Sequence, residues 1–143
     1  MAGQEILARI AILHDAQSSA IEPKLRARGY RWATFQLLTT LYGHARGLVQ
    51  AEVARRLAIT PPTLTEAIQL HLRLGLIEQV DDRRDRRSKR VLLTPAGKAA
   101  VKLMVRDIGA IEEQMLKGIT ETELSVVARV LDQMLTNLEG GDA

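Results

Sequence analysis

The sequence lacks cysteine altogether and is poor in aromatic residues, with one Trp, two Tyr and one Phe among 143 residues. The absence of cysteine excludes disulfides, thiolate metal ligands and a thiol redox sensor. The longest stretch without Asp, Glu, Lys or Arg is the 14 residues of 32–45, whereas a membrane-spanning helix needs roughly 20 apolar residues. No basic segment followed by an apolar one opens the chain, so we expect no export signal and a soluble cytoplasmic protein.

What is present is typical of a globular protein: 46% of the residues are hydrophobic and 26% are charged. That composition is too apolar for a disordered chain. A chain of this length has room for one core, so residues 1–143 are predicted to form a single domain.

Charge is distributed unevenly along the chain. Residues 81–90 hold six basic and three acidic side chains, whereas the residues from 107 onward hold eight acidic and two basic ones. Concentrated basic charge suits a polyanion, because neutralising phosphates releases their counterions. A solvated, internally paired loop is the alternative, and charge alone does not decide between the two.

Apolar residues recur at helical spacing over most of the chain, with a break or restart predicted at Pro23 and Gly29. Two short extended stretches, near 76–80 and 91–93, flank the charged segment and predict a hairpin with arginines at its tip. The predicted helices cover about residues 4–19, 32–45, 50–57, 61–74, 95–117 and 120–138.

The third and fourth of these helices have the pattern of a helix-turn-helix. Ala58 and Ile59 turn the chain, and Thr60 then serves as an N-cap with Pro61 at the first helical position. Two short helices joined by about three residues are typical of this motif.

The two C-terminal helices each carry a narrow apolar stripe of the coiled-coil type, which must be buried against another helix. The two stripes could cover each other within one chain. Packing between two copies is the favoured interpretation, because so small a domain has few other elements to cover them. The stripes consist of Val101, Met104, Ile108, Ile111 and Met115, and of Leu124, Val127, Leu131, Met134 and Leu138.

The charged segment and its surroundings resemble a known family. The sequence DRRDRR at 82–87, followed by VLLTPAG at 91–97, resembles the wing signature of MarR-type transcriptional regulators. Residues 50–57, 59–65 and 75–77 are also similar to the DNA-reading part of that family. Only about residues 48–97 carry distinctive motifs, although length and helix order match over the whole chain.

The resemblance implies a mostly α (α+β) fold, a winged helix-turn-helix with N- and C-terminal dimerisation helices. The DNA-binding part would span about 32–94, and the dimerisation helices about 1–22 and 95–143. It further implies a homodimer that binds double-stranded DNA at a pseudo-palindromic operator. Regulators of this type are most often repressors released by small aromatic or anionic effectors, so a ligand-responsive transcription regulator is the predicted function.

The predicted recognition helix turns its polar residues to one side, while Leu64, Ala67 and Ile68 face inward. Such helices present their N-terminal residues to the edges of bases in the major groove. Gln69 can read adenine, Glu66 can accept from cytosine, and threonine methyls can meet thymine. The candidate base contacts are Pro62, Thr63, Thr65, Glu66 and Gln69, and ordinary solvent exposure is the alternative.

An arginine-rich hairpin tip suits the minor groove and its phosphates. By resemblance, Arg87 would enter the groove and Asp85 would orient it. Arg84, Arg86 and Lys89 would touch phosphates, with further backbone contacts from Arg73 and, less specifically, Arg55 and Arg56. Asp81 and Asp82 would repel DNA, so we expect them to pair with Arg83 or Arg90 at the base of the hairpin.

Two residues depart from the family pattern. His71 stands where the family has a buried leucine, and it is predicted to be a core histidine with a hydrogen-bonded ring. An alternative is that its protonation loosens the DNA-reading part as pH falls. Arg31 replaces the usual Thr or Ser cap, which puts the helix start near residue 32 in doubt.

By the same resemblance, an effector pocket is expected near His14, Tyr30, Trp32 and Phe35, with ordinary core packing as the alternative. The histidines lack the spacing of metal ligands, and no phosphate loop, dinucleotide fingerprint or nucleophile elbow occurs. We therefore expect no metal, no cofactor, no membrane association and no enzymatic activity. The rival interpretations are a winged-helix protein-interaction module without DNA binding and a small helical enzyme using His14 or His71.

Overall fold

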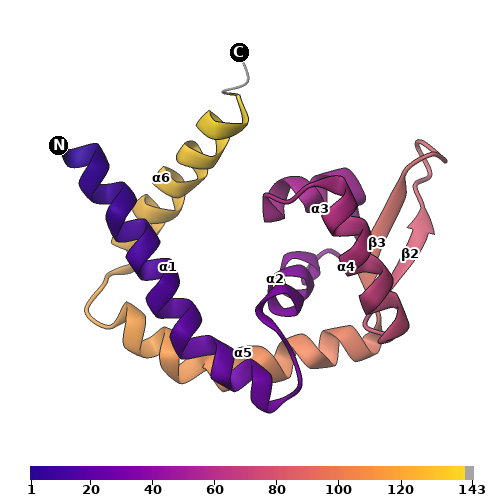
Figure 1. Cartoon of the computed structure of the whole chain (residues 1–143), viewed down its shortest axis with the longest axis horizontal. Coiled ribbons are helices and arrows are strands. Elements are labelled where there is room, and N and C mark those ends of the chain that lie inside the picture. Colours follow the sequence, from indigo (N-terminus) through magenta and orange to yellow (C-terminus); the bar gives the residue numbers. More distant parts are fainter. Residues whose placement is uncertain (141–143) are drawn as a thin grey trace. The chain divides into compact units, whose positions relative to one another are not determined.

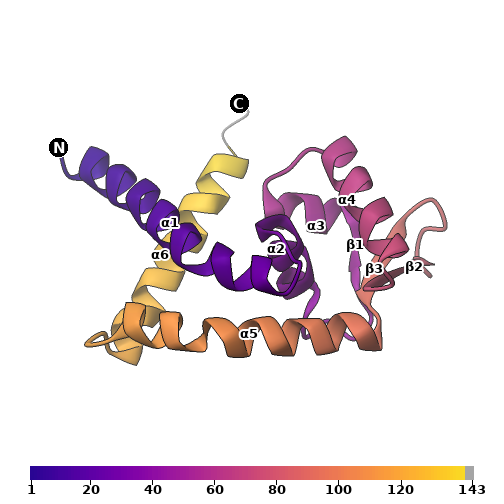
Figure 2. The ribbon, with the colours of Figure 1, turned by 60° about the horizontal axis from the view of Figure 1, so that its bottom comes forward.

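The computed structural model describes residues 1–140, and these fall into two compact units, residues 1–109 and the residues from 110 onward. Figures 1 and 2 show the chain as helices with a small sheet. The described elements are α1 (Ala2–Ala27), α2 (Trp32–Leu41), β1 (Leu48–Val49), α3 (Gln50–Leu57), α4 (Pro61–Arg73), β2 (Ile77–Asp81), β3 (Lys89–Leu93), α5 (Pro95–Leu116) and α6 (Glu121–Glu139). The predicted mostly α winged fold is confirmed.

The core of the first unit is built from the apolar sides of its helices and of β3. In both ribbon views α2 lies next to α5 and crosses its direction (Figures 1 and 2). Close packing of aliphatic side chains from several elements contributes most of the stability of such a unit. The fully buried side chains include Leu25, Leu37, Leu38, Leu41, Val53, Leu64, Ile68, Val91, Val101 and Met104.

The sheet is antiparallel with the strand order β1-β3-β2. The hairpin was predicted, whereas β1 was missed because two residues, Leu48 and Val49, give no alternating pattern. Its approach to β3 depends on Gly47, which has a φ of +72°. A Cβ at that position would lie 2.3 Å from the carbonyl oxygen of Val91, so no side chain fits without moving the strand.

The expected break at Pro23 is wrong, because α1 continues through it to Ala27. Proline removes one helical hydrogen bond, but Ile21 and Leu25 on either side are both buried in the core. That packing holds the helix together until Gly29, whose φ of +81° ends it. The predicted 32–45 helix likewise stops at Leu41, because Tyr42 is extended.

The start of α2 at Trp32 is confirmed, although Arg31 provides no side-chain cap. An ion pair then ties the end of α1 to α5: the Arg28 guanidinium donates to both carboxylate oxygens of Asp107, with Nη2 3.0 Å from Oδ1. The hydrogen bond from Arg28 lowers the pKa of Asp107 below its ordinary value. The two partners lie 79 residues apart in sequence, so the pair pins distant segments together.

The corner between β3 and α5 explains the Thr-Pro-Ala-Gly motif. The Thr94 hydroxyl donates to the carbonyl of Gly75 (2.6 Å) and accepts from the backbone N–H of Gly97 (3.1 Å). A Cβ on Gly97 would lie 2.0 Å from the carbonyl oxygen of Leu76. The motif therefore fixes the first turn of α5 directly against the end of α4 and the start of β2.

The apolar stripe of α5 is divided. Its first three positions, Val101, Met104 and Ile108, are buried in the core of the first unit, so this part is covered within the chain. On α6, by contrast, no residue is buried, and Leu131 and Leu138 are exposed. The predicted α6 cap is present, with Thr120 accepting from the Glu123 N–H at 3.1 Å.

None of the helices in the described part of the chain combines the length and apolar character needed to span a membrane.

Candidate nucleic-acid interface

The helix-turn-helix forms as its sequence predicts. Ala58 takes the left-handed conformation, with φ of +52°, between α3 and α4. The Thr60 hydroxyl then accepts from the Thr63 N–H at 3.3 Å, and Pro61 opens α4. Because the turn and the cap are both local, the two short helices hold a fixed geometry once Val53 and Ile68 are buried.

The outer face of α4 is the predicted one. Leu64 and Ile68 are buried, and the five candidate base contacts lie on the other side and are exposed. The hydroxyls of Thr63 and Thr65 are already used, by Thr60 at 2.9 Å and by the Pro61 carbonyl at 3.0 Å. The side chains of Glu66 and Gln69 have no partner in the described residues and so keep their full hydrogen-bonding capacity.

The tip of the β2–β3 hairpin is closed by its own backbone. The Asp82 N–H donates to the Ser88 carbonyl at 3.1 Å, and the Ser88 N–H donates to the Asp85 carbonyl at 2.9 Å. The Asp85 carboxylate accepts from the backbone N–H of Arg87 at 3.0 Å. Asp85 therefore shapes the backbone at Arg87, whereas the resemblance suggested that it would orient the side chain.

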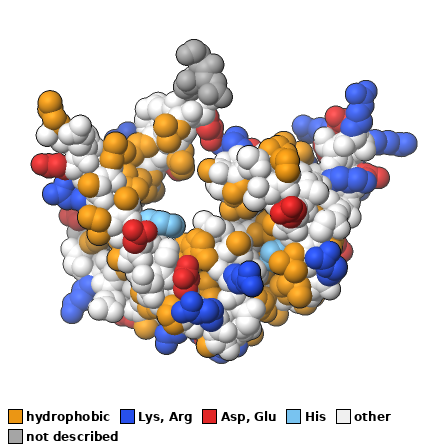
Figure 3. All heavy atoms as spheres, in the orientation of Figure 1, with side chains coloured by type: hydrophobic (Ala, Val, Ile, Leu, Met, Phe, Trp, Pro, Cys, Tyr) orange, Lys and Arg blue, Asp and Glu red, His pale blue; other side chains and the backbone are white. Residues whose placement is uncertain are grey.

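Cationic side chains cluster at this tip, where Figure 3 shows them projecting from the end of the hairpin. They are exposed, and none of them forms an ion pair with another described residue. Unpaired guanidinium groups keep their charge available for an external anion. The tip arginines are Arg83, Arg84, Arg86 and Arg87.

Carboxylates hold the cations at the base of the hairpin. Asp82 was expected to pair with Arg83 or Arg90, and it pairs with Arg90 at 3.5 Å. Arg90 also donates to the carbonyls of Arg46 (3.2 Å) and Gly47 (3.4 Å), which ties the hairpin to the loop before β1. Arg90 is therefore a structural anchor.

Asp81 pairs with Lys89, and the expectation of Arg83 or Arg90 as its partner is wrong. The reason is the strand register, which sets Asp81 directly opposite Lys89 across the hairpin. Lys89, predicted as a phosphate contact, is thus already engaged by a carboxylate.

The other basic residues of the helix-turn-helix also divide into an exposed arginine and arginines that are paired with a carboxylate. Arg73 is exposed in the last turn of α4. Arg55 and Arg56 both contact Glu52, each with an Nε–O distance of 2.9 Å. Their hydrogen bonds lower the pKa of Glu52 to about 2, so the carboxylate stays charged and neutralises part of this surface.

The predicted effector residues are only partly gathered. The His14 ring meets Trp32 edge-on at 6.1 Å, and Trp32 lies 5.5 Å from Phe35. An open cavity of about 360 Å³ adjoins this group and is lined by Glu22, Arg26, Tyr30, Arg31, Trp32 and Ala33. Tyr30 and Trp32 were predicted to line it, whereas His14 and Phe35 do not.

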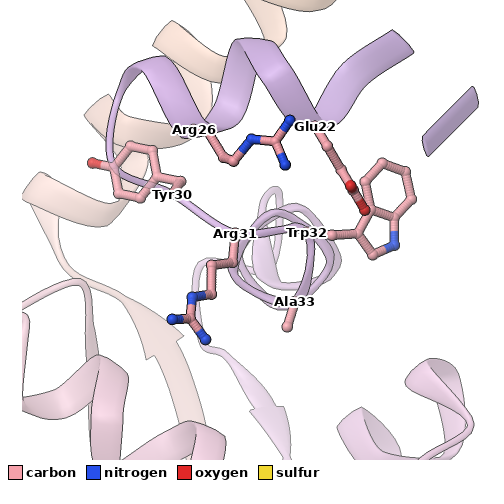
Figure 4. Close-up of a pocket in the computed structure, with 6 residues that line it drawn as sticks. All are labelled: Glu22, Arg26, Tyr30, Arg31, Trp32 and Ala33. Atoms are coloured by element: carbon pink, nitrogen blue, oxygen red, sulfur yellow. The ribbon is translucent and has the colours of Figure 1, made fainter. Parts of the chain in front are cut away.

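Figure 4 shows Glu22 and Arg26 projecting from α1 toward the start of α2, where Trp32 lies. These two charged residues were missed, although their spacing of four puts them on one face of a helix. The cavity thus combines aromatic rings with cations, which suits a small aromatic or anionic molecule. No cluster of three His, Asp or Glu side chains within residues 1–140 could hold a metal ion.

His71 is buried, as predicted for a core histidine, and both ring nitrogens have partners. Nε2 lies 2.9 Å from the Thr34 hydroxyl and Nδ1 lies 2.5 Å from the Ala67 carbonyl oxygen. Thr34 was not singled out from the sequence, because a threonine within an apolar helix gives no sign of its partner.

Comparison with known proteins agrees with this geometry. The family model described as MarR family matches residues 28–88. The Staphylococcus aureus protein MepR, in a structure titled as its DNA-binding conformation, is 26% identical, with a TM-score of 0.79 over 94% of this chain and 98% of that one.

Two further solved structures share the fold. The transcriptional regulator SlyA is 23% identical, with a TM-score of 0.75 over 93% of each chain. A mutant of Escherichia coli MarR complexed with operator DNA is 19% identical, with a TM-score of 0.74 over 92% of this chain and 94% of that one.

Proposed function

We propose that the protein is a sequence-specific, DNA-binding transcription regulator. Residues 28–88 match the family model described as MarR family, and the described chain has a winged helix-turn-helix fold. The observation that carries the proposal is the joint exposure, on one compact unit, of a polar helix face and an arginine hairpin tip without ion pairs. The related MepR and MarR structures, one titled as a DNA-binding conformation and one as an operator complex, support the same function.

In this proposal α4 enters the major groove and the hairpin follows the adjacent minor groove. Glu66 and Gln69 carry most of the base discrimination, because their polar groups are free whereas the hydroxyls of Thr63 and Thr65 are used within the helix. Pro62 and the threonine methyls add apolar contacts. Arg84, Arg86 and Arg87 supply groove and phosphate contacts, and Arg73 adds one at the end of α4.

Residues 1–22 and 95–143 are proposed to join two subunits, with residues 141–143 lying outside the described part. The support is the apolar surface of the single chain, where side chains of α1 and α6 stand exposed in number. On α1 these are Ile6, Leu7, Ile10, Ile12 and Leu13, and on α6 they are Val126, Val127, Leu131, Leu135 and Leu138. A two-fold dimer would bind a pseudo-palindromic operator with half-sites about 10 bp apart, or a multiple of that.

We also propose that the protein is a repressor released by a small molecule. The support is the cavity at the α1–α2 junction, where Arg26 and Arg31 stand beside Tyr30 and Trp32. Because the chain has one tryptophan, quenching of its fluorescence would report an aromatic or anionic compound entering this cavity.

Selection of bound duplexes from random DNA tests the proposed function. Wild-type protein should enrich a two-fold symmetric sequence, and Gln69→Ala should change which bases are enriched more than it changes overall affinity. Lys98→Ala, an exposed cation on α5, is the control and should select the same sequence as wild type. Recovery of random sequences by the wild type would overturn the proposal.

The main alternative function is that of a winged-helix module that binds a protein and not DNA. Its partner binding would be nearly insensitive to salt, whereas contact with several phosphates must weaken steeply as salt rises. The exposed arginine tip argues against this rival. The family comparisons, which are with transcription regulators, argue against the helical enzyme.

A further inference from the structure

Two polar side chains are buried within the described part of the chain, and they are hydrogen-bonded to each other. Thr34 of α2 is 6% exposed and His71 of α4 is 2% exposed. A buried polar group that loses its partner has a full desolvation cost, so a paired set of this kind constrains the elements it joins. This pair joins α2 to the predicted recognition helix.

The partners of the ring determine its tautomer. The Ala67 carbonyl can only accept, so Nδ1 must carry the hydrogen that it receives. In the neutral ring Nε2 is then an acceptor, and the Thr34 hydroxyl donates to it at 2.9 Å.

The position of the Thr34–His71 pair allows it to determine the orientation of α4. His71 is buried on the inner side of α4, whereas Glu66 and Gln69 are exposed on its outer side. A rotation of α4 about its axis would therefore move Glu66 and Gln69 relative to the bases. The same rotation would strain the Thr34–His71 hydrogen bond. Leu64 and Ile68 add apolar packing on the same side, but such packing has no comparable directional requirement.

We propose that His71 is a positioning residue for base recognition: its ring, oriented by the Ala67 carbonyl of the same helix and hydrogen-bonded to Thr34 of α2, fixes the rotation of α4 and so the placement of Glu66 and Gln69. The inference rests on the proposed DNA-binding function. It assigns a role in base recognition to a buried side chain that does not itself face the DNA.

The first test removes the donor and keeps the shape. Thr34→Val should reduce the ratio of selected-site to random-duplex affinity by about tenfold, while the affinity for random duplex and its salt dependence stay unchanged. Thr34→Ser restores the hydroxyl and should restore the ratio. Because Ser and Val bracket the native side chain in size, a packing defect alone would affect both variants.

The second test uses the double variant Thr34→Val/His71→Leu, which replaces both polar groups by apolar ones and so leaves no buried polar group without a partner. It should lose site preference as Thr34→Val does, because neither variant keeps the Thr34–His71 hydrogen bond. Nitrogen-15 spectra of the wild-type protein should show the ring hydrogen of His71 on Nδ1, facing the Ala67 carbonyl.

The two proposals fail in different ways. A wild-type protein that selects a site, combined with a Thr34→Val variant that selects it equally well, would overturn the positioning role alone. The opposite tautomer in the spectra would overturn it too. A wild-type protein that selects no site would overturn the proposed function and the positioning role with it.

Discussion

At the scale of single residues, the hairpin separates cations that stabilise the fold from cations that remain available. Arg90 and Lys89 are held by carboxylates, and Arg90 also by two loop carbonyls. The sequence alone predicted the exposed arginine tip, and it left Arg83 and Arg90 open as partners of Asp82, of which the structure shows Arg90. It could not predict that Asp81 meets Lys89, because that contact depends on the register of two strands, which a charged, non-alternating segment does not specify.

Replacement of Arg87 tests the available cations. Arg87→Ala should weaken binding to the selected duplex by roughly 1–3 kcal/mol and lower the slope of log affinity against log salt by about one unit. The measurement is fluorescence anisotropy at several salt concentrations. Arg9→Ala, at an exposed position on α1 paired with Glu5, is the control. Equal affinity of wild type and Arg87→Ala would refute the role given to the hairpin tip.

Replacement of Asp81 tests the restrained cations. Asp81→Asn should raise DNA affinity by a few fold, because it removes a negative charge and frees Lys89 at a cost of roughly 0.2–1 kcal/mol for an exposed pair. The gain should disappear in the double variant Asp81→Asn/Lys89→Ala, measured by the same titration. A lower affinity of the single variant would mean that the pair holds the hairpin in its binding conformation.

At the scale of elements, the helices with strong local signals were predicted within a few residues and the connections were not. α3 matches its predicted bounds because an apolar stripe and a turn define it. α1 was predicted too short because a proline is a weaker determinant than the burial of Ile21 and Leu25. Of the residues that line the cavity, Tyr30 and Trp32 were predicted, because the aromatic cluster is visible in the sequence. Glu22 and Arg26 were missed, because their position beside that cluster depends on how α1 packs.

Two glycines of α5 provide a matched test of the corner between β3 and that helix. Gly97→Ala should lower the free energy of unfolding by roughly 2–3 kcal/mol, because its Cβ has no room beside the Leu76 carbonyl. Gly109→Ala, where nothing lies within 4 Å of the added Cβ, should raise it by roughly 0.5–1 kcal/mol. Urea titration followed by circular dichroism measures both, and similar values for the two variants would contradict the packing described.

The Arg28–Asp107 pair gives the stability of the first unit a pH dependence. Because the folded-state pKa of Asp107 is lowered, its contribution is present above the unfolded-state pKa and is lost as pH falls through the folded value. Asp107→Asn should therefore melt below wild type at neutral pH and converge with it in acid. Thermal unfolding across the acidic range measures this, and a constant gap down to the lowest pH would argue against the pair.

At the scale of the whole molecule, the single chain leaves many apolar side chains of α1 and α6 exposed. The sequence stripes predicted helices that need a partner, and in the single chain α6 has no buried residue. The first half of the α5 stripe is instead core, which sequence spacing could not reveal, since a stripe looks the same whichever helix covers it.

A charge placed on the apolar side of α6 tests the proposed dimer. Leu131→Asp should give monomers in sedimentation equilibrium and should lower affinity for the two-fold site, because one lobe then binds without the other. Thr136→Asp adds the same charge to the same helix at an exposed polar position and should leave the dimer intact. A Leu131→Asp protein that remains dimeric would place the interface elsewhere.

The salt dependence of wild-type binding to its selected duplex tests the central claim most directly. If two subunits grip DNA through their arginine tips and helix ends, log affinity should fall linearly with log salt, with a slope of about −0.9 for each phosphate contacted. We predict a slope equivalent to several phosphates per dimer, markedly reduced when Arg84, Arg86 and Arg87 are all replaced by alanine. Binding that is indifferent to salt, or a slope that the triple variant leaves unchanged, would contradict the account.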